Sequence, residues 1–84
     1  MSGATEYAIA HPEYAAGFAV ATIVQGAGGH ANALGVLAAA AKNASTMRRL
    51  IDAAIVEREL TDGAAARVRQ SVCEWFAHDL WKGE

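Results

Sequence analysis

The stretch that decides the fold is residues 14–41, which reads YAAGFAVATIVQGAGGHANALGVLAAAA and contains no Asp, Glu, Lys or Arg. It makes up a third of the chain, and the segment Gly26-Ala27-Gly28-Gly29 divides it into two apolar halves. Because glycines break helices, we predict a helix–turn–helix hairpin here. The amphipathic second half of the chain is expected to pack on this hairpin.

The composition is that of one small globular domain of 84 residues, with 54% hydrophobic and 19% charged residues. Ala is the commonest residue and there is one Pro, and both facts favour helix. We therefore predict a single all-α domain over residues 1–84. It should be a compact bundle of three to four helices with antiparallel neighbours and helix contacts rich in Ala and Gly. Residues 1–10 are interpreted as a short lead-in, which either frays or docks on the body through Tyr7 and Ile9.

Four helices are predicted, over residues 12–25, 30–41 or 30–43, 46–60 and 63–80. Pro12 suits the first position of a helix, Asn43 or Ser45 can cap the third, and Thr61 or Asp62 can cap the fourth. The first helix is apolar all round, so we expect it to be buried centrally or by another subunit. The last two helices have apolar faces, made of Met47, Leu50, Ile51, Ala54 and Ile55 in one and of Ala65, Val68, Val72, Trp75 and Phe76 in the other.

A competing interpretation makes residues 19–25 a β-strand, because they include several β-branched side chains. Residues 26–31, GAGGHA, then match the G-x-G-x-x-A turn that holds a pyrophosphate at a helix N-terminus. Residues 42–60, where such a fold needs a further strand, have the pattern of a helix. A nucleotide-binding or enzymatic domain that uses the turn from Gly26 to Gly29 therefore stays an alternative.

No catalytic or metal-binding motif is present. His11, His30 and His78 lie in separate segments, and Cys73 has no recognisable partner. Glu74 and His78 are four residues apart, which could form half of a metal site, but such a pair is more typical of an exposed helix surface. We predict no enzyme, no cofactor and no metal.

The charge pattern argues against a nucleic-acid partner. All seven Lys and Arg residues lie from Lys42 onward, where seven Asp and Glu residues balance them, and no helix presents a basic stripe. Each half of the uncharged stretch is shorter than the roughly 20 residues that span a bilayer. No basic segment precedes an apolar run at the N-terminus, as a signal peptide would require. We predict a cytoplasmic protein without a membrane segment.

The candidate partner-binding residues are Trp81, Arg67, Glu74, His78 and Arg58. If the fourth helix reaches Trp81, the indole lies opposite its apolar face, on the side of Arg67, Glu74 and His78. An exposed Trp beside charged groups is typical of an interface anchor. The alternative is a tail that folds back and buries Trp81. Arg58 lies near the end of the third helix on its apolar side, where it could form a polar rim.

These observations favour a non-enzymatic binding module that docks on a protein partner as an inhibitor or adaptor of a larger complex. Phage-encoded inhibitors such as anti-CRISPR proteins are often of this size, an analogy of size alone. A self-associating structural protein is the second hypothesis, with residues 12–25 buried in a homodimer.

Overall fold

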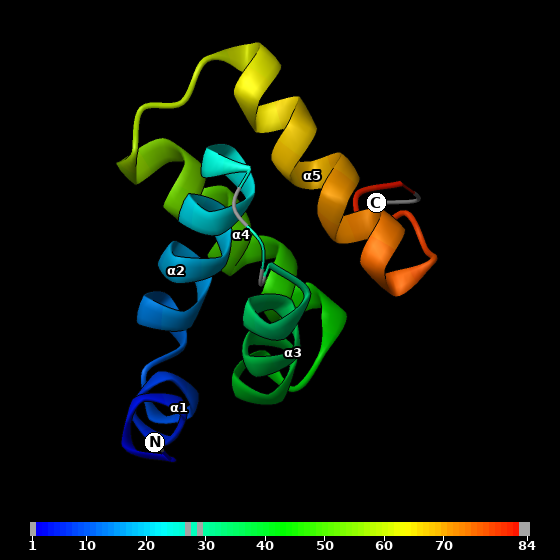
Figure 1. Cartoon of the computed structure of the whole chain (residues 1–84). Helices are drawn as coiled ribbons and strands as arrows, with labels where there is room; N and C mark the ends of the chain where they lie inside the picture. The colour runs from blue at the N-terminus through cyan, green and yellow to red at the C-terminus, as the bar shows by residue number, and fades with distance from the viewer. Residues whose placement is uncertain (1, 27, 29, 83–84) are drawn as a thin grey trace.

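The computed structural model describes residues 2–26, 28 and 30–82, which form five α-helices and no strand (Figure 1). The helices are α1 (Ser2–Ala10), α2 (Pro12–Gln25), α3 (His30–Ala41), α4 (Ala44–Glu57) and α5 (Asp62–Phe76). The all-α prediction is confirmed. Helix α1 occupies almost all of the predicted lead-in, and within it Ala8 is buried while Tyr7 and Ile9 are exposed. The helix stops at His11, since a residue that precedes a proline is disfavoured in the helical conformation.

The glycine segment makes a turn between two helices. Gly26 has a φ of 69°, a left-handed conformation that ends α2, and its N–H donates to the carbonyl oxygen of Ile23 at 3.1 Å. Ala27 and Gly29, the other half of the predicted turn, are outside the described residues. Helices α2 and α3 pack side by side and run in opposite directions (Figure 1). The helical hairpin is confirmed, and the β-strand over residues 19–25 is contradicted because they lie within α2.

The predicted caps of the last two helices are present. The side chain of Asn43 accepts from the N–H of Thr46 at 2.8 Å, and Thr61 accepts from the N–H of Ala64 at 3.2 Å. Both helices end before their predicted limits at Leu60 and Leu80. Helix α5 stops because the next residue, Ala77, takes a left-handed conformation with a φ of 55°.

The core lies among α2, α3, α4 and α5, and its largest fully buried side chains are Val20, Leu34, Leu37, Ile51, Val68 and Val72. Half of the buried hydrophobic residues are alanines, and this confirms the alanine-rich helix contacts. Leu50 and Phe76 are only partly buried. Trp75 was predicted to be buried, yet it leaves 41% of its surface exposed.

Candidate partner-binding surfaces

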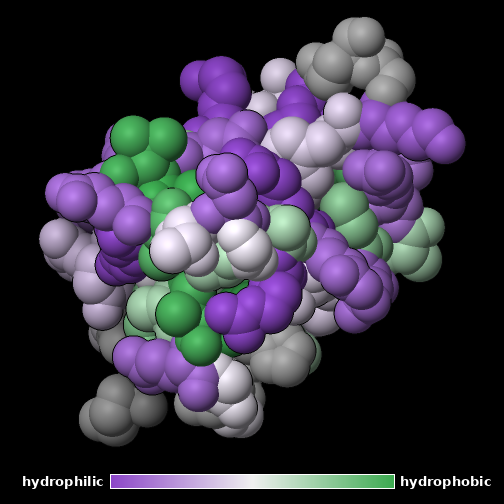
Figure 2. Space-filling model, turned by 90° about the horizontal axis from the view of Figure 1, so that it is seen from above, coloured by the Kyte–Doolittle hydropathy of each residue, from purple (hydrophilic) through white to green (hydrophobic). Residues whose placement is uncertain are grey.

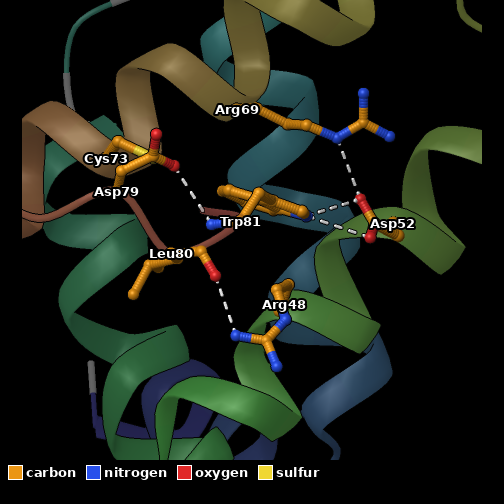
Figure 3. Close-up of polar contacts among 7 residues, drawn as sticks. All are labelled: Arg48, Asp52, Arg69, Cys73, Asp79, Leu80 and Trp81. Carbon is orange, nitrogen blue, oxygen red and sulfur yellow. Dashed lines mark hydrogen bonds and ion pairs between the residues drawn. The ribbon is translucent and has the colours of Figure 1, made fainter. Parts of the chain in front are cut away.

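The C-terminal turn, residues 77–82, folds back over the bundle and carries Trp81 inward (Figure 3). The indole N–H of Trp81 donates to both carboxylate oxygens of Asp52 on α4, at 3.0 and 3.2 Å. The Nε of Arg69 on α5 donates to the same carboxylate at 3.0 Å, and its guanidinium lies 5.9 Å from the centre of the indole. Of the two alternatives for Trp81, the structure contradicts an exposed position on the fourth helix and bears out the tail that folds back, with the indole partly buried.

A second set of bonds holds the same turn. Leu80 is 5% exposed, and its carbonyl oxygen accepts from Nη1 of Arg48 on α4 at 2.8 Å. The carboxylate of Asp79 accepts the backbone N–H of Trp81 at 3.1 Å. Helices α4 and α5 make few direct contacts, so the turn supplies part of the packing between them. The C-terminal turn therefore belongs to the fold itself.

The other residues predicted on the fourth helix are exposed but do not form one row. Arg67 and Glu74 lie on the outside of α5, and Glu74 accepts a hydrogen bond from the side chain of Gln70 at 3.1 Å. His78 follows the left-handed Ala77 and is outside the helix, so its predicted register with Glu74 is wrong. A partner-binding role for these three residues stays a prediction.

Arg58 follows the last residue of α4, and its guanidinium lies against Gly17 of α2, the helix on which α4 packs. A Cβ atom added to Gly17 of α2 would stand 3.0 Å from Nη2 of Arg58. Nη1 is 3.8 Å from the carboxylate of Glu57, and both side chains of this pair are exposed. The absence of a side chain at Gly17 makes room for the guanidinium, which bridges the end of α4 to α2.

An aromatic face, which consists of Tyr7, Tyr14 and Phe18, lies on α1 and α2. These side chains are 52%, 52% and 53% exposed. Tyr7 meets Tyr14 edge to face with ring centres 5.2 Å apart, and the ring of His11 stacks on Tyr7 at 3.9 Å. Helix α2 is therefore not buried all round. Its inner side is made of small residues, which are Ala15, Ala16, Gly17, Ala19 and Val20, and its large rings lie outside.

Tyr14 and Phe18 form a ridge between two grooves. One groove runs between this ridge, α1 and α3, and its lining is Thr5, Ala8, Ala15, Asn32, Ala33 and Val36. The other lies between the ridge and α4, where Glu13, Gly17, Ala21, Glu57 and Arg58 line it. Figure 2 shows hydrophobic side chains interrupting a mainly hydrophilic surface. The rings thus stand beside hollows that a partner could fill.

The described residues contain no cluster of three or more His, Cys, Asp and Glu side chains placed to hold a metal ion. Cys73 is a free thiol, 3.6 Å from the carboxylate of Asp79. None of the described helices is long and apolar enough to cross a bilayer. Comparison of the chain with protein-family models, curated proteins and solved structures finds no match.

The sequence contained a signal for the aromatic face that the helical pattern alone did not resolve. Tyr14 and Phe18 are one turn apart, and the small residues at 15, 16, 19 and 20 lie on the neighbouring side of the same helix. A helix that packs closely through alanines leaves its large side chains at the edge of the contact. Small residues, and not overall hydropathy, therefore mark the buried side of α2.

Proposed function

We propose that this chain is a non-enzymatic binding module that docks on another protein, as an inhibitor or adaptor of a larger complex. The observation that supports the proposal is the aromatic face, in which Tyr7, Tyr14 and Phe18 each leave about half of their surface exposed. Tyr and Phe are enriched in the cores of protein interfaces, where their rings bury a large area with few rotatable bonds. Two of the three rings carry a hydroxyl, which can form hydrogen bonds with water while the face is exposed and with a partner when the face is covered.

The grooves beside the ridge favour a protein partner over a small molecule. Both are open to solvent, and the lining of each includes small side chains, such as Ala15 in one and Gly17 in the other. Pockets for small molecules are more enclosed and bury most of the ligand. A row of projecting side chains from another protein fits such a surface better.

Affinity capture from an extract of the source cells tests this function. The immobilised protein is compared with a double variant, Tyr14→Ala with Phe18→Ala, and with Trp75→Ala as the matched control. Trp75 is also exposed but lies on α5. We expect a specific protein to be retained by the unchanged chain and by the Trp75 variant, and lost by the double variant. If all three proteins retain the same set, the aromatic face is not the binding surface.

The second candidate is a homodimer through α2, which the exposed ring of Phe18 also favours. Sedimentation equilibrium over a range of concentrations separates the two functions. A monomeric mass at all concentrations supports the binding module, whereas a dimer that Phe18→Ala dissociates supports self-association.

A further inference from the structure

We infer that the occupant of the aromatic face is a basic amphipathic helix of the partner protein. This inference rests on the function proposed above and specifies the chemistry of that partner. It combines the shape of the two grooves with the distribution of charge around them.

The shape favours a helix. Ala15 and Ala33 line the groove beside α1 and leave room for side chains that project from a neighbouring helix, while Arg58 covers Gly17 in the groove beside α4. An amphipathic helix that lies in a groove projects its apolar side chains at i, i+3, i+4 and i+7, so one row of them can lie on each side of a ridge. Asn32 and Thr5 at the edge of the first groove offer polar groups to the rim of that helix.

The apolar area of the face is too small to stabilise a complex by itself. An aromatic side chain buries about 150–250 Å² when it is fully covered, so three half-exposed rings supply about 300 Å². A stable interface buries about 800 Å² on each partner. More than half of the contact must therefore come from the groove linings and the charged groups around them, and the charge of these groups selects the partner.

Those surroundings are acidic. Residues 1–41, which form α1, α2 and α3, contain Glu6 and Glu13 but no Lys or Arg. Glu13 lines the groove beside α4 and makes no ion pair with any described residue. The side chain of Glu57, 80% exposed, lines the same groove and lies 3.8 Å from Nη1 of Arg58, the single cation that lines either groove within the described residues. A partner with Lys or Arg beside its apolar row complements these carboxylates.

The same charge argues against two other occupants. A second copy of the chain would bring a further excess of carboxylates to the contact, because its own face carries Glu13 and Glu57 against the single cation of Arg58. An anionic membrane surface attracts basic segments and repels carboxylates. A basic amphipathic helix can make both kinds of favourable contact, since its apolar row covers the rings and its Lys or Arg side chains are attracted to the carboxylates.

Two synthetic amphipathic helices of equal length test the inference. Both have Leu and Phe at i, i+3, i+4 and i+7; one carries Lys beside this row and the other carries Glu. Binding is measured by fluorescence anisotropy of the labelled peptides. We expect the Lys peptide to bind at least about tenfold more tightly at low salt, and the preference to shrink as salt screens the charges. Phe18→Ala should weaken binding of the Lys peptide, and the pair Glu13→Gln with Glu57→Gln should remove the preference.

Several outcomes overturn the inference. They are equal binding of the two peptides, no binding of either, a preference that survives the Gln variants, and binding that is insensitive to Phe18→Ala. If any of these occurs while the double variant still loses its captured protein, the inference fails and the proposed function stands. If the double variant also retains the same proteins as the unchanged chain, both fail. A dimer that Phe18→Ala dissociates identifies the occupant as a second copy and overturns the inference as well.

Discussion

The aromatic face and the C-terminal turn both hold aromatic side chains near the surface, yet their rings have different surroundings. In the turn, Trp81 has its N–H bonded to Asp52 and a guanidinium beside its ring. On the aromatic face, Tyr14 meets the ring of Tyr7 edge to face, and Tyr14 and Phe18 leave about half of their surface to solvent. The comparison teaches that a ring in contact with two helices stabilises the fold, while rings that stay half exposed are the ones that we propose for contact with another protein.

The largest expected effect comes from Trp81→Ala. This change removes the side chain that lies between α4 and α5 and leaves Asp52 without its indole donor. We expect the free energy of unfolding to fall by about 3 kcal/mol, the lower end for loss of a buried large aromatic side chain. Urea denaturation followed by circular dichroism measures it. Trp81→Phe, which keeps a ring but loses the N–H, is the control and should cost about 1 kcal/mol.

If Trp81→Ala is as stable as the unchanged chain, the turn does not hold α4 and α5 together and the comparison fails. Trp81 would then again be a candidate partner anchor with Arg67, Glu74 and His78.

A smaller effect is expected from Asp52→Ala. The change removes the carboxylate that accepts from both Trp81 and Arg69. Because these side chains are only partly buried, we expect a loss of about 2 kcal/mol, within the range for hydrogen bonds to charged groups. A double-mutant cycle with Trp81→Phe should give a coupling free energy of about 1 kcal/mol. A coupling near zero would show that the bond between the indole and the carboxylate adds no stability.

On the aromatic face, Phe18→Ala should cost only about 1 kcal/mol in the same denaturation assay, because half of the ring is already exposed. Trp81→Phe has a similar expected cost in stability, yet the comparison predicts that Phe18→Ala weakens binding and that Trp81→Phe leaves it unchanged. Parallel measurements of unfolding and of peptide anisotropy on these two variants check this difference. A loss of 3 kcal/mol or more for Phe18→Ala would make this ring part of the core.

Much of the fold was predictable from the sequence. The apolar rows of Met47–Ile51–Ile55 and Val68–Val72 are buried as their 3.6-residue spacing predicts, and Asn43 and Thr61 cap their helices through the expected bonds. Local pattern suffices there because an apolar stripe and a capping side chain act within one helix.

The two tryptophans were not predictable in this way. Alanine is the best helix former, so nothing in the local pattern marks Ala77 as the left-handed residue that ends α5. That turn is stabilised by bonds to Arg48 and Asp52, about 30 residues away along the chain. The early end of α5 moves Trp81 inward, while Trp75, predicted to be buried, stays at the surface. Contacts between residues distant in sequence therefore determine that Trp75 is exposed and Trp81 partly buried. For this reason the candidate site predicted around Trp81 could not be checked from local pattern alone.

The smallest expected effect is that of Gly17→Ala, on the side of α2 next to the aromatic face. Replacing a glycine inside a helix by alanine favours the helix by about 1 kcal/mol. The new methyl group would stand 3.0 Å from the guanidinium of Arg58, which lies at the end of a flexible side chain and can move away. We expect a net gain of about 0.5 kcal/mol, measured as a rise in the midpoint of thermal unfolding.

The control is the same change in an Arg58→Ala background, where the methyl group meets no guanidinium and the full gain of about 1 kcal/mol is expected. Movement of Arg58 should also leave the groove beside Phe18 more acidic at its centre, so Gly17→Ala is predicted to strengthen binding of the Lys peptide. A loss of stability from Gly17→Ala that Arg58→Ala relieves would instead show that the guanidinium is fixed over α2. In that case Arg58 stays in the groove beside Phe18. The net negative charge that attracts a basic partner is then smaller than the charge of Glu13 and Glu57 alone.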